Sequence, residues 1–88
     1  MSETNIRIDT DGTVTDIAPK STREGYSLEE VQGYVGGYVE MISLNGSDIM
    51  LVDEDGRMKG LPPNGMASVL AMRPIVGPVI VIPRKSLK

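Results

Sequence analysis

The residues with the clearest potential for chemistry are the carboxylates Glu40, Asp53, Glu54 and Asp55 in the middle of the chain. Two carboxylates held at a fixed separation in a cleft can hydrolyse a glycosidic bond. However, a chain of 88 residues with 3% aromatic residues offers little material for a sugar-binding cleft. Solvated surface carboxylates are therefore favoured, and a hydrolase that uses Glu40 and Glu54 is the least favoured functional hypothesis.

The segment at 59–65, KGLPPNG, is the second candidate site. It leads into a predicted helix, and the N–H groups at a helix N-terminus attract anions. Lys59, Asn64 and Gly65 could present donors to a phosphate or an acidic partner, while the two prolines stiffen the loop. The alternative is a purely structural joint, in which Asn64 only caps the helix. If the loop is a binding site, Lys59→Glu should weaken binding by at least about tenfold and leave the melting temperature nearly unchanged.

No metal or cofactor is expected. Two D-x-D-G stretches, 9–12 and 53–56, resemble part of a calcium loop, but Arg7 and Leu51 stand where that loop needs an oxygen ligand. Turns are the favoured interpretation. The chain has no His and no Cys, which removes the usual zinc ligands, disulfides and thiol nucleophiles.

Charge and hydropathy argue against a nucleic-acid-binding protein and against a membrane or secreted protein. A net charge of −3 argues against binding to nucleic acid, which requires a basic surface. No apolar run has the length of a membrane span, and the N-terminal residues lack the pattern of a signal peptide. These features fit a cytoplasmic protein.

The first predicted helix has signals at both ends. Ser27 and Glu30 form a capping box, and Gly36-Gly37 ends the helix. The residues expected on its buried face are Leu28, Val31 and Val35. A second helix is predicted to begin at Asn64 and to stop before Pro74, with a core-facing stripe of Met66, Val69 and Leu70.

Strands are predicted around these helices. The chain should begin with a hairpin within residues 1–18, and a second hairpin should join 38–44 to 48–52 through Asn45-Gly46. A further short strand is possible at 57–61, and PVIVI at 78–82 should be a strand buried on both faces. Residues 84–88 are expected to fray.

The order β-β-α-β-β-α-β predicts an α+β fold: a single domain over residues 1–88 with a mixed sheet of about five strands and two short helices. Two short helices can bury only a small part of a sheet that contains a strand as apolar as PVIVI. We therefore expect a homo-oligomer, most simply a dimer. The six methionines are predicted mainly to fill the core, with a pliable contact surface as the alternative.

The assembled pattern resembles the phage-associated domain-of-unknown-function family 3846. The similarity covers about residues 26–83 and rests on GGYVEMISL, DEDGRMKGLPPN, MASVLA and PIVGPVIVI. At position 53, where the family often has asparagine, this chain has Asp53. The positions that the resemblance marks as typical are Gly36, Gly37, Glu40, Glu54, Gly56, Leu61, Pro62, Asn64, Ala67 and Gly77.

The resemblance implies a small accessory protein of a phage or mobile element, with no established activity. The first hypothesis is therefore a non-catalytic binding protein that captures a host protein in the host cytoplasm, in host take-over or anti-defence. The alternative is an oligomeric protein that binds a nucleotide or a small signalling molecule through the 59–65 loop. The candidate binding residues are Lys59, Asn64, Gly65, Glu40 and Glu54.

Overall fold

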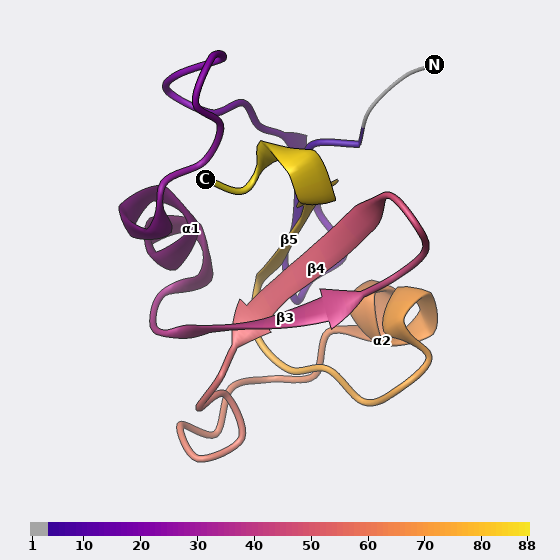
Figure 1. The fold of residues 1–88 in the computed structure, drawn as a ribbon. Helices are drawn as coiled ribbons and strands as arrows, with labels where there is room; N and C mark the ends of the chain where they lie inside the picture. Colours follow the sequence, from indigo (N-terminus) through magenta and orange to yellow (C-terminus); the bar gives the residue numbers. More distant parts are fainter. Residues whose placement is uncertain (1–3) are drawn as a thin grey trace.

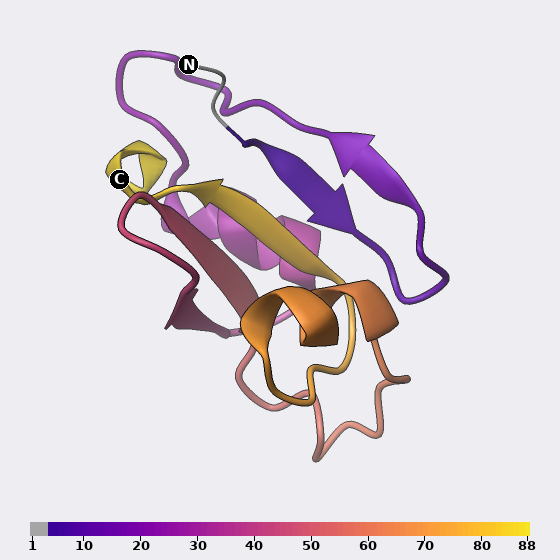
Figure 2. The same cartoon turned by 90° about the vertical axis from the view of Figure 1, so that its right-hand side faces the viewer.

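The computed structural model describes residues 4–88, so residues 1–3 of the predicted N-terminal hairpin region lie outside the described part. The described chain forms one five-stranded sheet with a helix on each face (Figures 1 and 2). Its elements are β1 (Ile6–Ile8), β2 (Val14–Asp16), α1 (Leu28–Val35), β3 (Val39–Ser43), β4 (Asp48–Asp53), α2 (Gly65–Ala71), β5 (Val79–Pro83) and a 3₁₀ helix (Arg84–Ser86). The predicted α+β class and element order are confirmed.

The sheet is antiparallel throughout, in the order β2-β1-β5-β4-β3. The prediction of a mixed sheet is therefore wrong. A helix between two strands often belongs to a crossover that makes them parallel. Here the segment at 54–78 returns the chain to the end of the sheet where β4 finished, so β4 and β5 run in opposite directions.

The two faces of the sheet carry separate apolar clusters because neighbouring strand residues point to opposite sides. The cluster on the α1 face contains Tyr26, Val31, Val35, Ile49, Leu51, Ile80 and Ile82. The cluster on the α2 face contains Ile8, Ile42, Met50, Val52, Ala67, Ile75, Val79 and Val81. Strand β5 contributes to both clusters and is buried along its whole length, as predicted.

The central position of β5 in the sheet removes the reason for expecting self-association through this strand. The strand lies between β1 and β4 and is covered on both faces, so it offers neither an open face nor an open edge. The reason that the sequence gives for self-association is therefore wrong, although self-association itself stays a prediction.

Helix α1 is defined by the predicted end signals. The N–H of Glu30 donates to the Ser27 hydroxyl at 3.2 Å, and the Ser27 N–H donates to the Glu30 carboxylate at 3.0 Å. Gly36 ends the helix with a φ of 95°, where a side chain would be strained. Val31 and Val35 are buried as expected, whereas Leu28 is exposed.

The predicted short strand at 57–61 is absent. The backbone instead winds through successive turns, in which the N–H of Lys59 donates to Asp55 O and the N–H of Gly60 donates to Arg57 O. The D-x-D-G stretch at 53–56 opens these turns, and the other one, at 9–12, closes the β1–β2 hairpin. Both stretches are turns, as predicted.

The C-terminal residues form a 3₁₀ helix and hydrogen bonds with the rest of the chain, while their fraying stays a prediction. The N–H of Tyr26 donates to Ser86 O at 2.7 Å, and the N–H of Lys88 donates to Tyr26 O at 2.8 Å. The Tyr26 hydroxyl donates to the Asn5 side chain at 2.9 Å. Burial raises the pKa of Tyr26 to about 12. Tyr26 thus joins both ends of the described chain.

Candidate functional site

Helix α2 places its small residues inward and its large residues outward. Ala67 is fully buried and Ala71 packs against the same cluster. Met66, Val69 and Leu70 are all exposed, with Val69 at 76%. The prediction that these three residues face the core is therefore wrong. Small side chains let the helix lie close to the sheet, and its apolar stripe then faces outward.

Met72 extends this exposed stripe. It ends α2 in the left-handed conformation with a φ of 58°, and it is 91% exposed. Glycine is the usual residue at such a position, because a side chain there costs free energy. We call Met66, Val69, Leu70 and Met72 the α2 apolar surface.

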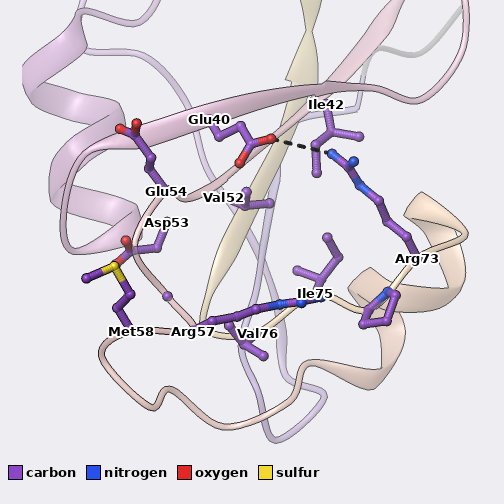
Figure 3. Close-up of a pocket in the computed structure, with 12 residues that line it drawn as sticks. Glu40, Ile42, Val52, Asp53, Glu54, Arg57, Met58, Arg73, Ile75 and Val76 are labelled. Atoms are coloured by element: carbon purple, nitrogen blue, oxygen red, sulfur yellow. Dashed lines mark ion pairs between the residues drawn. The ribbon is translucent and has the colours of Figure 1, made fainter.

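A pocket of about 230 Å³ opens between β3–β4 and the segments on either side of α2, and its lining residue Arg73 directly follows Met72 (Figure 3). Its walls carry both charges. Glu40 comes from β3 and Arg73 from the residues after α2, and they form an ion pair at 3.7 Å. The lining residues are Glu40, Ile42, Val52, Asp53, Glu54, Gly56, Arg57, Met58, Arg73, Pro74, Ile75 and Val76.

Two glycines let the loops around this pocket pack closely. A Cβ on Gly56 would lie 2.8 Å from Val76 Cγ2. Gly77 has a φ of 78°, and a Cβ there would lie 2.7 Å from Leu61 Cδ1. A side chain at either position would therefore force Val76 or Leu61 to move before the segment at 54–61 could lie against 75–77.

Lys59 neutralises a buried carboxylate. Its Nζ lies 2.7 Å from Asp53 Oδ2, and the Asp53 side chain is only 1% exposed. The other Asp53 oxygen accepts the N–H of Asp55 at 2.8 Å. Lys59 also reaches Gly36 O at 3.4 Å, so it ties the end of α1 to the end of β4. Lys59→Glu is thus expected to destabilise the fold, contrary to the expectation for a purely surface lysine.

Asn64 is the centre of a buried hydrogen-bond network. Its Oδ1 accepts the N–H of Ala67 at 3.1 Å, which confirms the predicted helix cap. Its Nδ2 donates to Ile8 O at 3.1 Å and to Gly77 O at 2.9 Å. The Ser68 hydroxyl donates to Asn64 O at 2.7 Å and accepts the N–H of Ile75 at 2.8 Å. Every polar group of the Asn64 side chain is therefore engaged.

The structure brings some of the predicted site residues together and separates others. Glu40 and Glu54 line the pocket. Lys59 and Asn64 are bonded within the fold, and exposed Gly65 begins α2 away from the pocket lining. Binding by these five residues stays a prediction.

The sequence did not point to Arg57, Arg73 or the outward stripe of α2 as parts of a surface. The methionine content was the available signal. Of the methionines within residues 4–88, only Met50 is buried. Met41, Met58, Met66 and Met72 are exposed, so the prediction that methionines mainly fill the core is wrong for these four.

Residues 4–88 contain no group of three or more acidic side chains arranged to hold a metal ion. None of the helices in this part of the chain has the length and apolar character needed to cross a membrane.

The fold and this surface define a small α+β domain with one amphipathic helix and one helix that exposes its large apolar residues. The chain belongs to the family of the domain of unknown function DUF3846, whose model matches residues 4–86. The match includes the N-terminal hairpin, which lies outside the 26–83 region of the sequence resemblance. No curated protein and no solved structure matches the chain.

Proposed function

We propose that this domain is a small non-catalytic binding protein that acts by stoichiometric capture of another protein. The observation that carries the proposal is the α2 apolar surface. Helix α2 exposes Met66, Val69 and Leu70, and Met72 is 91% exposed in a conformation that favours glycine. Large apolar side chains gathered on one exposed element are typical of a contact surface between proteins.

The composition of the surface supports a protein partner. Methionine side chains are flexible and polarizable, and they adapt to the shape of an opposing surface. The adjoining pocket adds charges of both signs, with Glu40 and Glu54 near Arg57 and Arg73. These charged residues can orient a partner, while the apolar residues supply most of the affinity.

The proposed biological setting rests on the family resemblance. It suggests an accessory protein of a phage or mobile element that captures a host protein in the host cytoplasm, as in host take-over or anti-defence. A small, negatively charged chain that offers a surface rather than a deep cleft supports capture over turnover.

Capture of a nucleotide-like molecule by the 59–65 loop has less support. Lys59 is bonded to Asp53, and Asn64 is 0% exposed with all its side-chain polar groups engaged. A carboxylate-dependent hydrolase also has less support, because Glu40 is paired with Arg73.

The test compares two double variants with the same change of charge. Val69→Lys with Met72→Lys alters the α2 apolar surface, whereas Leu28→Lys with Val14→Lys alters exposed apolar residues elsewhere. Partners are captured from host cells, identified by mass spectrometry, purified and titrated by calorimetry. We expect saturation at a fixed molar ratio and a loss of at least about tenfold in affinity for the first variant alone, about 1.4 kcal/mol.

Equal binding by both double variants would place the contact elsewhere on the domain. A nucleotide released from the purified wild-type protein on denaturation, with no protein captured, would favour the alternative hypothesis.

A further inference from the structure

Strand β3 is an edge strand with a row of outward-facing backbone groups. The N–H of Glu54 donates to Tyr38 O at 2.9 Å, and the N–H of Leu44 donates to Asp48 O at 3.1 Å. Hydrogen-bonded positions alternate along an antiparallel pair. The even-numbered residues of β3 therefore face β4, while the N–H and C=O groups of Val39, Met41 and Ser43 point away from the sheet. Within residues 4–88 no strand lies beyond them.

This edge lacks the features that usually protect one. Edge strands are commonly very short or carry lysine, proline or a bulge. Strand β3 has five residues, pairs with β4 in an unbroken register and contains no lysine or proline. The opposite edge, β2, has only three residues, all exposed. Tyr38 and Met41, beside the open groups of β3, are 69% and 47% exposed.

The sequence of β3 is complementary to itself in an antiparallel arrangement centred on Met41. In that register Met41 lies opposite Met41 of the partner subunit, and Val39 lies opposite Ser43 of the partner subunit. All three outward residues then exchange N–H and C=O groups with the second copy. Exposed Tyr38 lies opposite Leu44 of the partner subunit, which makes an aromatic–aliphatic cross-strand pair.

The charged side chain of β3, Glu40, is compatible with this pairing. Glu40 lies opposite Ile42 of the partner subunit and is only diagonal to the other Glu40. Each Glu40 is also 3.7 Å from its own Arg73, which offsets the repulsion. Arg84 contacts the Ser43 hydroxyl at 2.7 Å and Met41 Sδ at 3.9 Å. These side chains lie on a face of the sheet, so they leave the backbone edge open.

We propose that the domain forms a two-fold symmetric dimer through β3, with one continuous antiparallel sheet across both copies. The partner at this edge is a second copy of the chain, because self-pairing satisfies the backbone row and gives the flanking side chains matched neighbours. This interface differs from the α2 apolar surface, and it does not depend on the proposed capture.

The dimer would join the two pockets. Glu40 and Ile42 line the pocket and flank Met41, where the proposed dimer axis crosses β3. Opposite residues in an antiparallel pair point to the same face of the sheet, so both α2 helices would lie on one side. Two capture surfaces on one side allow two linked contacts with a partner, which raises the overall affinity without new interactions.

Residue 41 is suited to the test, because in the proposed dimer Met41 of one copy lies opposite Met41 of the partner subunit. Met41→Lys places two cations opposite one another at the axis, each beside its own Arg84, and we expect it to dimerise at least about tenfold more weakly than wild type. Met41→Glu also places like charges there, but Arg84 offsets part of their repulsion, so we expect a smaller loss. An equimolar mixture should recover dimers, because Glu and Lys then face each other. Sedimentation equilibrium at roughly 1 to 300 µM measures these affinities. Thermal unfolding checks that the exposed substitutions leave the fold intact.

The matched controls are Thr15→Glu and Thr15→Lys at the centre of the other edge strand, and both should dimerise like wild type. Amide exchange supplies an independent measurement. Protection of Val39, Met41 and Ser43 should rise with protein concentration, while Glu40 and Ile42 stay protected by β4.

A wild-type chain that remains monomeric over the whole concentration range would overturn the proposal. So would Met41 variants that associate like wild type, a mixture that does not recover dimers, or weaker association only in the Thr15 variants.

Discussion

The two helices are attached to the sheet by different kinds of interaction. Helix α1 buries Val31 and Val35 among the apolar side chains of β4 and β5. Helix α2 buries only Ala67 within its own length, yet it begins at the hydrogen-bonded network of Asn64 and Ser68. Apolar burial holds α1, and directed hydrogen bonds hold α2.

This difference has a consequence for how each helix can be used. Helix α1 is held by its apolar face, and Leu28 is its one large apolar side chain left exposed. A helix that is held by its cap and by small residues keeps its large apolar side chains available. The contrast therefore explains how a chain of only 88 residues can maintain a core and still expose a contact surface.

The largest expected effect is at Asn64. Asn64→Ala removes the cap of α2 and the buried amide that donates to the Ile8 and Gly77 carbonyls, of which Ile8 keeps only its pairing with Val79 in the sheet. We expect the free energy of unfolding to fall by about 4 kcal/mol in urea denaturation. The control is Asn45→Ala, because Asn45 also accepts backbone N–H groups but is exposed, and it should cost at most about 1 kcal/mol. Similar losses at both positions would show that the buried network does not hold α2.

The second prediction applies one change to both helices. Val35→Ala on α1 should cost about 2.5 kcal/mol, because it removes buried methyl groups and leaves a cavity. Val69→Ala on α2 should change the free energy of unfolding by less than about 0.5 kcal/mol, because Val69 is 76% exposed. Chemical denaturation measures both. A large cost at Val69 would mean that the outward stripe of α2 contributes to the core.

The third prediction concerns the polar contact at the end of α1. Lys59→Glu replaces the cation beside Asp53 with a second carboxylate, and we expect a loss of about 2 kcal/mol, reduced by the partial exposure of Lys59. Adding Asp53→Asn should recover most of this loss in a double-mutant cycle. If Lys59→Glu melts like wild type, the ion pair contributes nothing to stability.

The smallest effect is expected at the N-terminus of α1. Ser27→Ala should cost about 1 kcal/mol, because the N–H of Glu30 loses its acceptor. An unchanged denaturation midpoint would show that the hydroxyl does not cap the helix.

The same capping box makes the stability of the fold depend on pH. Hydrogen bonds from the Ser27 and Lys20 N–H groups lower the pKa of Glu30 below its ordinary value of 4.5. A lowered pKa in the folded state stabilises the fold above pH 4.5, and this contribution is lost as the pH falls through the folded-state pKa. Glu30→Gln should remove this dependence, whereas Ser27→Ala should keep most of it, since the N–H groups of residues 27 and 20 remain and only the smaller contribution of the Ser27 hydroxyl is lost.

The sequence predicted the features that depend on neighbouring residues. The caps at Ser27, Gly36 and Asn64 and the buried strand β5 are short-range signals, and the structure confirms them. The orientation of α2 was not predictable in this way. An apolar stripe normally indicates the buried face, and nothing local shows that Ala67 and Ala71 would pack against the sheet instead.

The candidate site was harder to predict because its pairs come from distant segments. Glu40 meets Arg73, and the Asn64 side chain donates to the carbonyl of Ile8. Such contacts follow from the sheet order, and β1 beside β5 is a pairing that the order of the elements does not specify.

That pairing also constrains the order in which the chain can assemble. The β3–β4 hairpin is local and can form early, but β1 has no neighbour on its inner side until β5 is available. Pairings between distant segments slow folding because the chain must first close a long loop. Until β1 docks, the apolar strand β5 presents an open edge that can pair with another unfolded chain. We therefore expect docking of the N-terminal hairpin to be the step at which folding competes with aggregation.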